Sequence, residues 1–214
     1  MSESVLFDYW RSSSSFRVRI ALNLLRLPHT IVSVNLLAHE QRTPENLARN
    51  PQGLVPTLRI DGHDLTQSLA IIEYLHEITP GSTLLPKDPF SRSQVRAVAH
   101  AIAMEIHPIC NLSVVAHVQS ITGGDDRARI AWMRKFIRDG LVAVEGMLNR
   151  LPSDAFCYGP TPTIADICLV PQMYNADRWG VETADLPRVR STKAVCEALP
   201  AFSTAYPQNP CEAV

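Results

Sequence analysis

The sequence has no Cys-x-x-Cys pair, no paired histidine spacing and no excess of charge of one sign. Its five cysteines (Cys110, Cys157, Cys168, Cys196 and Cys211) are scattered and odd in number, which argues against a disulfide framework and favours a reducing cytoplasm. Seven histidines without ligand spacing predict no metal centre. A net charge of −1 gives no electrostatic reason for binding nucleic acid or an anionic membrane surface.

Long apolar runs are also missing. No stretch approaches the ~20 apolar residues that span a bilayer, and no basic segment followed by a long apolar run precedes the first strand pattern. We therefore expect neither a membrane span nor a signal peptide. The chain has 214 residues, 46% of them hydrophobic and 19% charged, which is typical of a globular protein with one large domain or two small ones.

The first part of the chain alternates between strand and helix patterns. Strands are expected at 5–9, 30–35, 57–60 and 63–65, and helices at 13–25, 44–49 and 67–78. Asp61-Gly62 between the last two strands is a strong hairpin signal. The order β-α-β-α-β-β-α predicts a thioredoxin-like domain over residues 1–85.

After a proline-containing linker at 85–89, every long segment has helical periodicity. Helices are expected at 91–121, 125–151, 163–179 and 187–199, the first as one long helix or a broken pair because Pro108 should bend it. Thr163 and Asp166 have the spacing of a capping box, which explains Asp166 better than a catalytic role does. The predicted fold class is therefore α/β plus all-α, with an all-helical domain over residues 90–214.

The most informative segment is the run Ser12-Ser13-Ser14-Ser15, which lies between a short strand and a helix. Serine is a preferred N-cap, since its hydroxyl accepts an orphan backbone N–H of the first turn. The start of a helix also favours an anion, and a hydroxyl there can donate a hydrogen bond to a thiolate. Taken alone, the run is explained by helix capping.

Four further segments, taken together with the serine run, form a recognisable pattern along the chain. The five segments are 12–22, Val55-Pro56-Thr57, 67–75, Asn111-Leu112-Ser113 and 165–172. In this order, and over nearly the whole chain, they resemble the zeta class of the glutathione transferase superfamily. The resemblance implies glutathione as the cofactor, a homodimer, and a helical glutathione transferase domain after the thioredoxin-like one.

The resemblance assigns the central role to Ser12, which matches the serine that stabilises the thiolate of glutathione, with Ser13 as the alternative. Glutathione's thiol resembles free cysteine, whose pKa is near ~8.5, and only the thiolate is nucleophilic. A hydroxyl donor at a helix start could lower that pKa by roughly one to two units. Ser14 stands where the family usually has cysteine, so cysteine-based side chemistry at that position is not expected.

Other residues of the first domain are expected to hold the rest of glutathione. By resemblance, the proline after Val55 is cis, and Val55 offers its backbone to the cysteinyl part like an added strand. Gln67 and Ser68 open a helix and bind the γ-glutamyl carboxylate, while His39 or Gln41 contacts the glycyl end. The complete set expected in this domain is Ser12, Ser13, Ser14, Ser15, Phe16, Arg17, His39, Gln41, Val55, Gln67 and Ser68.

By resemblance, His107, Asn111, Leu112 and Ser113 of the helical domain are expected near glutathione, either that of the same subunit or that of a partner subunit. A polar residue at a helix bend explains His107 equally well. Arg11 and Arg178 match basic positions of the family and are expected to grip substrate carboxylates bidentately. For Arg178 the alternative is a surface salt bridge with Asp177 or Glu182.

The activity that the resemblance implies is the glutathione-dependent cis–trans isomerisation of maleylacetoacetate, a dicarboxylate keto acid, to fumarylacetoacetate in tyrosine and phenylalanine degradation. Transient addition of the thiolate to the double bond is covalent catalysis. Two alternatives share the site: a maleylpyruvate isomerase, whose pattern has arginines where this chain has Leu112 and Ser113, and a zeta transferase acting on α-halo acids. The third alternative is a non-enzymatic binding module. Such a module would need none of Ser12, Val55-Pro56 and Gln67-Ser68, so the presence of all three argues against it.

Overall fold

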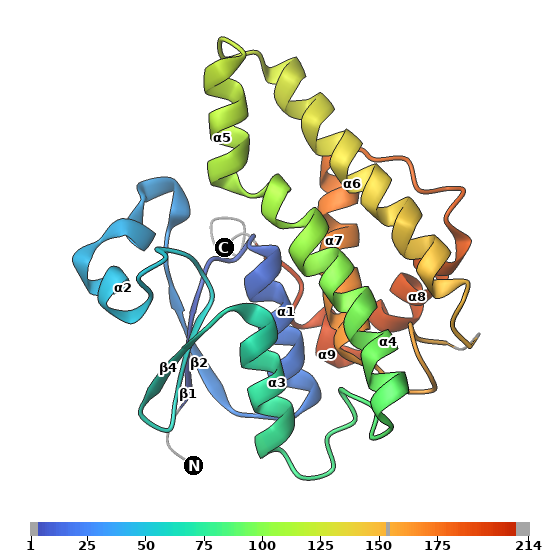
Figure 1. The fold of residues 1–214 in the computed structure, drawn as a ribbon. Coiled ribbons are helices and arrows are strands. Elements are labelled where there is room, and N and C mark those ends of the chain that lie inside the picture. Colours follow the sequence, from blue (N-terminus) through green and yellow to red (C-terminus); the bar gives the residue numbers. More distant parts are fainter. Residues whose placement is uncertain (1–3, 153–154, 209–214) are drawn as a thin grey trace. The chain divides into compact units, whose positions relative to one another are not determined.

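A computed structural model describes residues 4–152 and 155–208, so Cys211 lies outside the described residues. The chain divides into two compact units (Figure 1). One unit holds the described residues up to Ser82 together with those from Leu199 onward, and the other is Thr83–Ala198. The first unit is α/β and the second is helical, which confirms the predicted fold class. The ranges 1–85 and 90–214 stay a prediction, because compactness does not by itself define independently folding domains.

A four-stranded mixed sheet forms the centre of the first unit, in the strand order β2-β1-β3-β4. The strands are β1 (Ser4–Asp8), β2 (His29–Ser33), β3 (Thr57–Ile60) and β4 (His63–Thr66). β1 is parallel to β2 and antiparallel to β3, and β3 pairs with β4 as a hairpin. Asp61 and Gly62 both have positive φ, 49° and 82°, as a two-residue hairpin with a type I′ turn requires.

Helices cover the sheet. They are α1 (Ser13–Leu24), α2 (Pro44–Arg49) and α3 (Ser68–Ile78). α1 and α3 pack side by side on one face, and α2 lies on the other (Figure 1). The order β-α-β-α-β-β-α is the one predicted.

The buried residues of α3 are Ser68, Ile71, Ile72 and Leu75. They follow the spacing i, i+3, i+4, i+7, which places them on one face of the helix. Ser68 at the start of the helix therefore shares this buried face.

The first unit also contains the chain from Leu199 onward, including the short helix α9 (Pro200–Ser203). This segment packs against α1, where the Asn23 amide donates to the Ala201 carbonyl and to Thr204 Oγ1, both at 3.1 Å. The Arg19 guanidinium donates to the Ala205 carbonyl at 3.0 Å. A late stretch of the sequence therefore supports the first helix.

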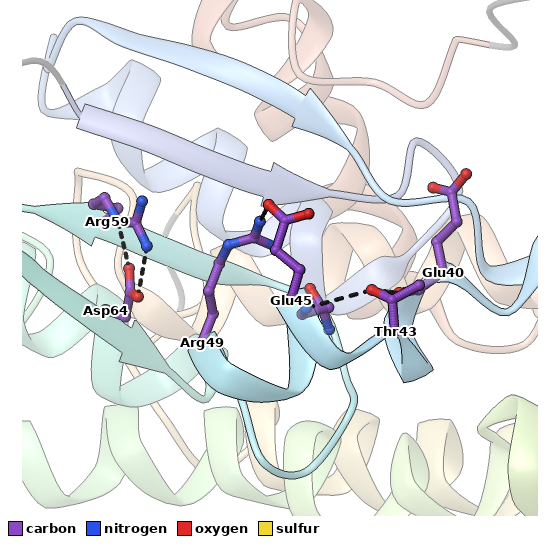
Figure 2. A network of polar contacts seen from close by, with 7 residues as sticks. Glu40, Thr43, Glu45, Arg49, Arg59 and Asp64 are labelled. Atoms are coloured by element: carbon purple, nitrogen blue, oxygen red, sulfur yellow. Dashed lines mark hydrogen bonds and ion pairs between the residues drawn. The ribbon is translucent and has the colours of Figure 1, made fainter.

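Two arginines cover Phe7 on the sheet face that α2 occupies. Arg49 of α2 lies 4.2 Å from the ring centroid and Arg59 of β3 lies 5.4 Å from it. Figure 2 shows that each arginine also has an acidic partner, Glu45 for Arg49 and Asp64 for Arg59. Asp64 accepts two bonds of 2.8 Å from Arg59, and this hydrogen bonding lowers the pKa of the Asp64 carboxyl.

The second unit is helical throughout its described elements. It comprises α4 (Pro89–His100), a π-helical segment (Ala101–Ile106), a 3₁₀ turn (Pro108–Cys110), α5 (Leu112–Ile121), α6 (Asp126–Leu148), α7 (Ile164–Trp179) and α8 (Pro187–Glu197). The helix expected over 91–121 is thus a broken pair, bent by 40° between Pro89–Cys110 and Leu112–Ile121. The His107 N–H bonds to the Ile102 carbonyl five residues back, at 3.0 Å, so the helix widens just before Pro108.

Among the described residues, no single helix is long and apolar enough to cross a membrane. The bent pair Pro89–Cys110 and Leu112–Ile121 passes that test by length and composition only.

Candidate active site

Strand register brings four segments of the first unit to one end of its sheet. Phe7 near the end of β1 pairs with Thr57 at the start of β3, and Thr57 pairs with Thr66 at the end of β4. β2 runs parallel to β1, with Ser33 opposite Asp8. The serine run after β1, the loop after β2, the turn before β3 and the start of α3 after β4 therefore all lie at this end. These are the segments that hold the predicted glutathione-binding residues of the first domain.

Ser12 is the N-cap of α1. Its backbone is extended (φ −68°, ψ 121°) and its Oγ accepts the Ser15 N–H at 3.2 Å. The side chain is half-buried. Ser12 Oγ acts as the acceptor in this hydrogen bond, so the hydrogen of its hydroxyl can be donated to another acceptor. The capping explanation is thus confirmed, and it leaves the hydroxyl able to donate to a thiolate.

The turn before Ser12 is held by a buried ion pair. Arg19 of α1 donates to both carboxylate oxygens of Asp8, at 2.7 and 2.8 Å, and to the Trp10 carbonyl at 3.0 Å. Arg11 lies over the rings of Trp10 and Tyr9, at 5.4 and 6.0 Å from their centroids. The backbone that leads into the serine run is therefore held by the Arg19 hydrogen bond to Trp10 and by the stacking of Arg11 on Tyr9 and Trp10. The sequence pattern did not reveal the pairing of Asp8 with Arg19.

The peptide bond between Val55 and Pro56 is cis, as the resemblance implied. The loop before it is ordered by Asn50, a buried side chain that donates to the Leu54 carbonyl at 3.0 Å and accepts the Gln52 N–H at 3.1 Å. Asn50 is a supporting residue that the sequence reasoning missed. The signal that could have found it is the Asn-Pro-x-Gly turn that it opens.

Gln67 and Ser68 open α3 without a side-chain cap. Gln67 has φ 66°, which is strained for a residue other than glycine, and its amide donates to Gln52 Oε1 at 2.8 Å. Ser68 is 7% exposed and its Oγ accepts from Arg17 at 3.3 Å. The Gln67 side chain makes no capping hydrogen bond to this eleven-residue helix, and the N–H groups of a helix start suit an anionic ligand.

His39 and Gln41 lie in the loop between β2 and α2. His39 is exposed and adopts the left-handed conformation, with φ 58°. Gln41 is half-buried, and the Asn46 side chain donates to its carbonyl at 3.0 Å. Thr43 caps α2 and donates to the Glu40 carbonyl at 2.9 Å, which fixes the loop on the helix (Figure 2). Both residues stay candidates for the glycyl end of glutathione.

The remaining predicted residues of the serine segment are mostly buried. Ser13, Ser15, Phe16 and Arg17 are buried and Ser14 is half-buried. Phe16 makes an edge-to-face contact with Tyr206, at 5.7 Å between ring centroids. Arg17 is only 1% exposed. Direct contact of these side chains with glutathione stays a prediction.

The predicted residues of the second unit cluster around the break before α5. Asn111 is the N-cap of α5, where its Oδ1 accepts from the Val114 N–H at 3.0 Å and from Ser113 Oγ at 2.8 Å. Leu112 and Ser113 are exposed, and His107 is half-buried at the end of the π-helical segment. A structural role therefore explains Asn111 and Ser113 locally, and their contact with glutathione stays a prediction.

Arg178 lies in the last turn of α7 and is exposed. Its guanidinium lies 5.3 Å from the centroid of the Trp179 ring. Asp177, one of its two suggested partners, pairs with Lys193 at 2.7 Å. Whether Arg178 contacts a substrate stays a prediction.

The capping box at the start of α7 is present. Asp166, which is fully buried, accepts the Thr163 N–H at 2.8 Å, and the Thr163 side chain accepts the Ala165 N–H at 3.3 Å. Asp166 also accepts the Cys157 N–H at 2.8 Å. Burial raises the pKa of the Asp166 carboxyl, and burial also raises the pKa of the Cys196 thiol near it. These contacts give Asp166 a structural role.

The thioredoxin-like fold and the anion-suited helix starts define a class of protein, and comparison with known proteins identifies it. Residues 6–83 match the family model of the glutathione S-transferase N-terminal domain. The chain is 55% identical over 208 residues to the maleylacetoacetate isomerase of Rhizobium meliloti strain 1021, covering 97% of this chain and 98% of the relative.

Two solved structures are similar over the same length. One is the holo structure of a maleylpyruvate isomerase, described as a bacterial glutathione S-transferase in zeta class, with TM-score 0.92, 40% identity and coverage of 95% and 96%. The other is the maleylacetoacetate isomerase of Methylobacterium extorquens AM1 with bound malonate and glutathione, with TM-score 0.91, 36% identity and coverage of 95% and 96%. The chain therefore belongs to the zeta class of the glutathione S-transferase superfamily.

Proposed function

We propose that this protein is a glutathione-dependent isomerase that converts maleylacetoacetate to fumarylacetoacetate. The observation that carries the proposal is the meeting of Ser12, the cis Val55-Pro56 turn and the start of α3 at one end of one sheet. The 55% identity to a maleylacetoacetate isomerase, against 40% to the maleylpyruvate isomerase of known structure, favours maleylacetoacetate as the substrate.

The residues at this end of the sheet fit glutathione. The start of α3 offers N–H groups that the Gln67 side chain does not cap, together with the Ser68 hydroxyl, and this donor set suits the γ-glutamyl carboxylate. The Val55 backbone beside the cis proline suits strand-like pairing with the cysteinyl part. Gln41 or His39, in the loop after β2, would bind the glycyl end.

Ser12 would hold the sulfur. When bound, glutathione supplies the thiolate that adds to the cis double bond, allows rotation about the resulting single bond and leaves again from the trans product. The Ser12 hydroxyl, whose acceptor side faces Ser15, would donate to that sulfur. The positive end of α1 would favour the same negative charge. Together they would lower the pKa of the thiol and raise the fraction of thiolate at neutral pH.

The substrate is a dicarboxylate, so the enzyme needs cations that touch it. Arg11 and Arg178 are the proposed ones, since a guanidinium can bind a carboxylate through two parallel hydrogen bonds. The relative crystallised with malonate and glutathione supports a dicarboxylate substrate. Arg178→Met should therefore slow turnover of maleylacetoacetate more than conjugation of an uncharged electrophile. An equal loss on both substrates would assign Arg178 to the fold or to glutathione.

The decisive experiment is an isomerisation assay on the purified protein with and without glutathione. We expect turnover of maleylacetoacetate only with glutathione, and a kcat/KM above that for maleylpyruvate. A higher kcat/KM for maleylpyruvate would replace the proposed substrate and keep the reaction type. Tight glutathione binding without turnover of either substrate, or of an α-halo acid, would favour a non-enzymatic binding module.

Two finer features complete the proposal. A homodimer is expected from the resemblance, and sedimentation at micromolar concentration tests it, since a monomer there would exclude it. A cytoplasmic location is expected because Cys110, Cys157, Cys168 and Cys196 are free thiols, the form that a reducing compartment maintains. Fractionation of the source cells tests this location.

A further inference from the structure

Two guanidinium groups from different helices of the second unit lie beside one indole ring. Arg178, in the last turn of α7, has its guanidinium carbon 5.3 Å from the centroid of the Trp179 ring. Arg129, near the start of α6, has its guanidinium carbon 5.4 Å from the same centroid. The electron-rich face of an indole attracts a guanidinium. The ring therefore holds a second cation, Arg129, close to the one that the proposed function assigns to the substrate.

The Trp179 ring belongs to a fixed piece of backbone. The Trp179 carbonyl accepts a hydrogen bond of 2.8 Å from the Arg134 guanidinium, which joins α6 to the end of α7. Gly180 follows as the C-cap of α7, with φ 61°. The partial negative charge of a helix end explains why cations gather here. It does not explain why Arg129 and Arg178 share one ring while Arg134 serves the carbonyl.

The Arg129 guanidinium has bonding capacity left. Its ion partner is Asp126, one turn earlier on α6, at 3.3 Å, and the two side chains are 34% and 67% exposed. An ion pair exposed to this degree contributes little stability. Asp126 also accepts a hydrogen bond of 2.8 Å from Gln119, so it keeps a partner without Arg129. The Arg129 Nε is covered and meets no acceptor among the described residues. A carboxylate from outside can therefore replace Asp126 at the Nη groups.

We propose that Arg129 is a specificity-determining residue that binds the carboxylate at the acetoacetyl end of the substrate, together with Arg178. This inference rests on the proposed function, in which the sulfur adds to the double bond beside the other carboxylate, that of the maleyl end. Arg11 directly precedes Ser12, the residue proposed to hold that sulfur, so the maleyl carboxylate has its own cation. The acetoacetyl carboxylate is then the one that requires the arginines at the end of α7.

The shared ring gives this pair of arginines a use for an anion. Two like charges held beside one ring repel each other, and a bound carboxylate is attracted by both. The flat guanidinium can present two parallel N–H groups to a carboxylate, and stacking on the ring restricts its orientation. Trp179 is thus a positioning residue in the proposal, while Arg129 and Arg178 make the contacts.

The test compares two substrates that differ only in the acetoacetyl carboxylate. Maleylacetoacetate carries it, and maleylacetone, the decarboxylated analogue, keeps the double bond and the maleyl carboxylate. The full chain is assayed for isomerisation of each at saturating glutathione. We expect Arg129→Met to lower the wild-type preference for maleylacetoacetate in kcat/KM at least about fivefold, or about 1 kcal/mol, chiefly through KM. The kcat/KM for maleylacetone should stay near wild type.

Matched variants separate a local contact from a general effect of charge. Arg127→Met removes the same charge from the same helix, at a side chain that is 93% exposed and lies 3.6 Å from Asp125, and it should leave the preference unchanged. Arg129→Lys keeps the charge without the planar fork and should recover part of the preference. Trp179→Leu removes the ring and should lower the preference at least about threefold. Arg129→Gln carries the test if Arg129→Met does not fold.

The outcomes separate this inference from the proposed function. Equal losses on both substrates in the Arg129 variants would give Arg129 a purely structural role and overturn the inference. The same loss of preference in Arg127→Met would also overturn it, because the effect would then be one of net charge. A wild-type protein without preference for maleylacetoacetate would overturn it too, while isomerisation of both substrates would uphold the proposed function. A wild-type protein that isomerises neither substrate would refute both.

Discussion

Replacing Ser12 by alanine should produce two separable losses, because its hydroxyl has two hydrogen-bonding directions. The acceptor direction caps α1 through the Ser15 N–H, at 3.2 Å. Loss of an N-cap costs about 0.5–2 kcal/mol, and the length of this bond places it in the lower half of that range. At about 2–4 °C per kcal/mol for a chain of this size, the melting temperature of Ser12→Ala should fall by a few degrees.

The donor direction affects turnover. If the hydroxyl lowers the pKa of the bound thiol by about one to two units, its loss removes about 1.4–2.7 kcal/mol, since one unit is worth 1.36 kcal/mol. Turnover near neutral pH should then fall by about ten- to a hundredfold, while glutathione affinity changes little. The deficit should shrink as the pH rises above the raised thiol pKa, because the variant then also binds the thiolate.

The assays are thermal unfolding, glutathione titration, and kcat against pH, together with the ultraviolet absorbance of the bound thiolate. Ser12→Thr is the matched control, since it keeps both a cap and a hydroxyl. A loss of turnover that is independent of pH would refute the thiolate argument. Wild-type turnover in Ser12→Ala combined with loss in Ser13→Ala would move the assignment by one residue.

Three other sites have consequences that can be measured. Gly140→Ala should destabilise the helical unit by about 1–3 kcal/mol in thermal unfolding, because a Cβ there would clash with the Ile106 side chain; adding Ile106→Ala should recover part of the loss, and an unchanged melting temperature would contradict this packing. Asp166→Ala should lower stability by about 0.5–2 kcal/mol or more and leave glutathione affinity intact, whereas unchanged stability with lost activity would make Asp166 catalytic. Burial raises the pKa of Cys110 to about 11, so at pH 8 peptide mapping should find its alkylation about two orders of magnitude slower than that of a free thiol near 8.5. The Cys110 thiol stays protonated in the fold up to about pH 11 but ionises near 8.5 in the unfolded chain, so the free energy of unfolding should be unaffected by this thiol below about pH 8.5 and should fall as the pH rises toward 11. Rapid labelling of Cys110, or the same alkaline loss of stability in Cys110→Ala, would refute the raised pKa.

The order of elements in the first unit was predictable because each element carries its own local signal. The Asp61-Gly62 turn marks the hairpin, and Thr43 with Pro44 marks the start of α2. Such signals act over a few residues, and the predicted boundaries accordingly fall within one or two residues of the observed ones. The meeting of the site segments then follows from the topology, because the strand register allows only one end for them.

Features that depend on contacts between distant residues could not be predicted in the same way. The helix widens locally at 101–106 before the 40° break, and Gly140 of α6 lies close to Ile106, a residue 34 positions earlier. The ion pair of Asp8 with Arg19 and the contact of Arg17 with Ser68 join residues on different elements. The sequence shows that Asp8, Arg17 and Arg19 are charged, but only the packing of α1 shows that their side chains are buried.

Ser12 and Ser68 make the same use of a serine at the start of a helix. Each hydroxyl accepts a hydrogen bond from a protein donor, the Ser15 N–H for Ser12 and the Arg17 guanidinium for Ser68. A serine hydroxyl that accepts from the protein has its single hydrogen left for an outside acceptor. Under the proposed function, the hydrogen of Ser12 would serve a thiolate at α1 and that of Ser68 a carboxylate at α3, where the helix ends already favour negative charge. Orientation by a protein donor is therefore the physical feature that Ser12 and Ser68 share, although they lie on different helices.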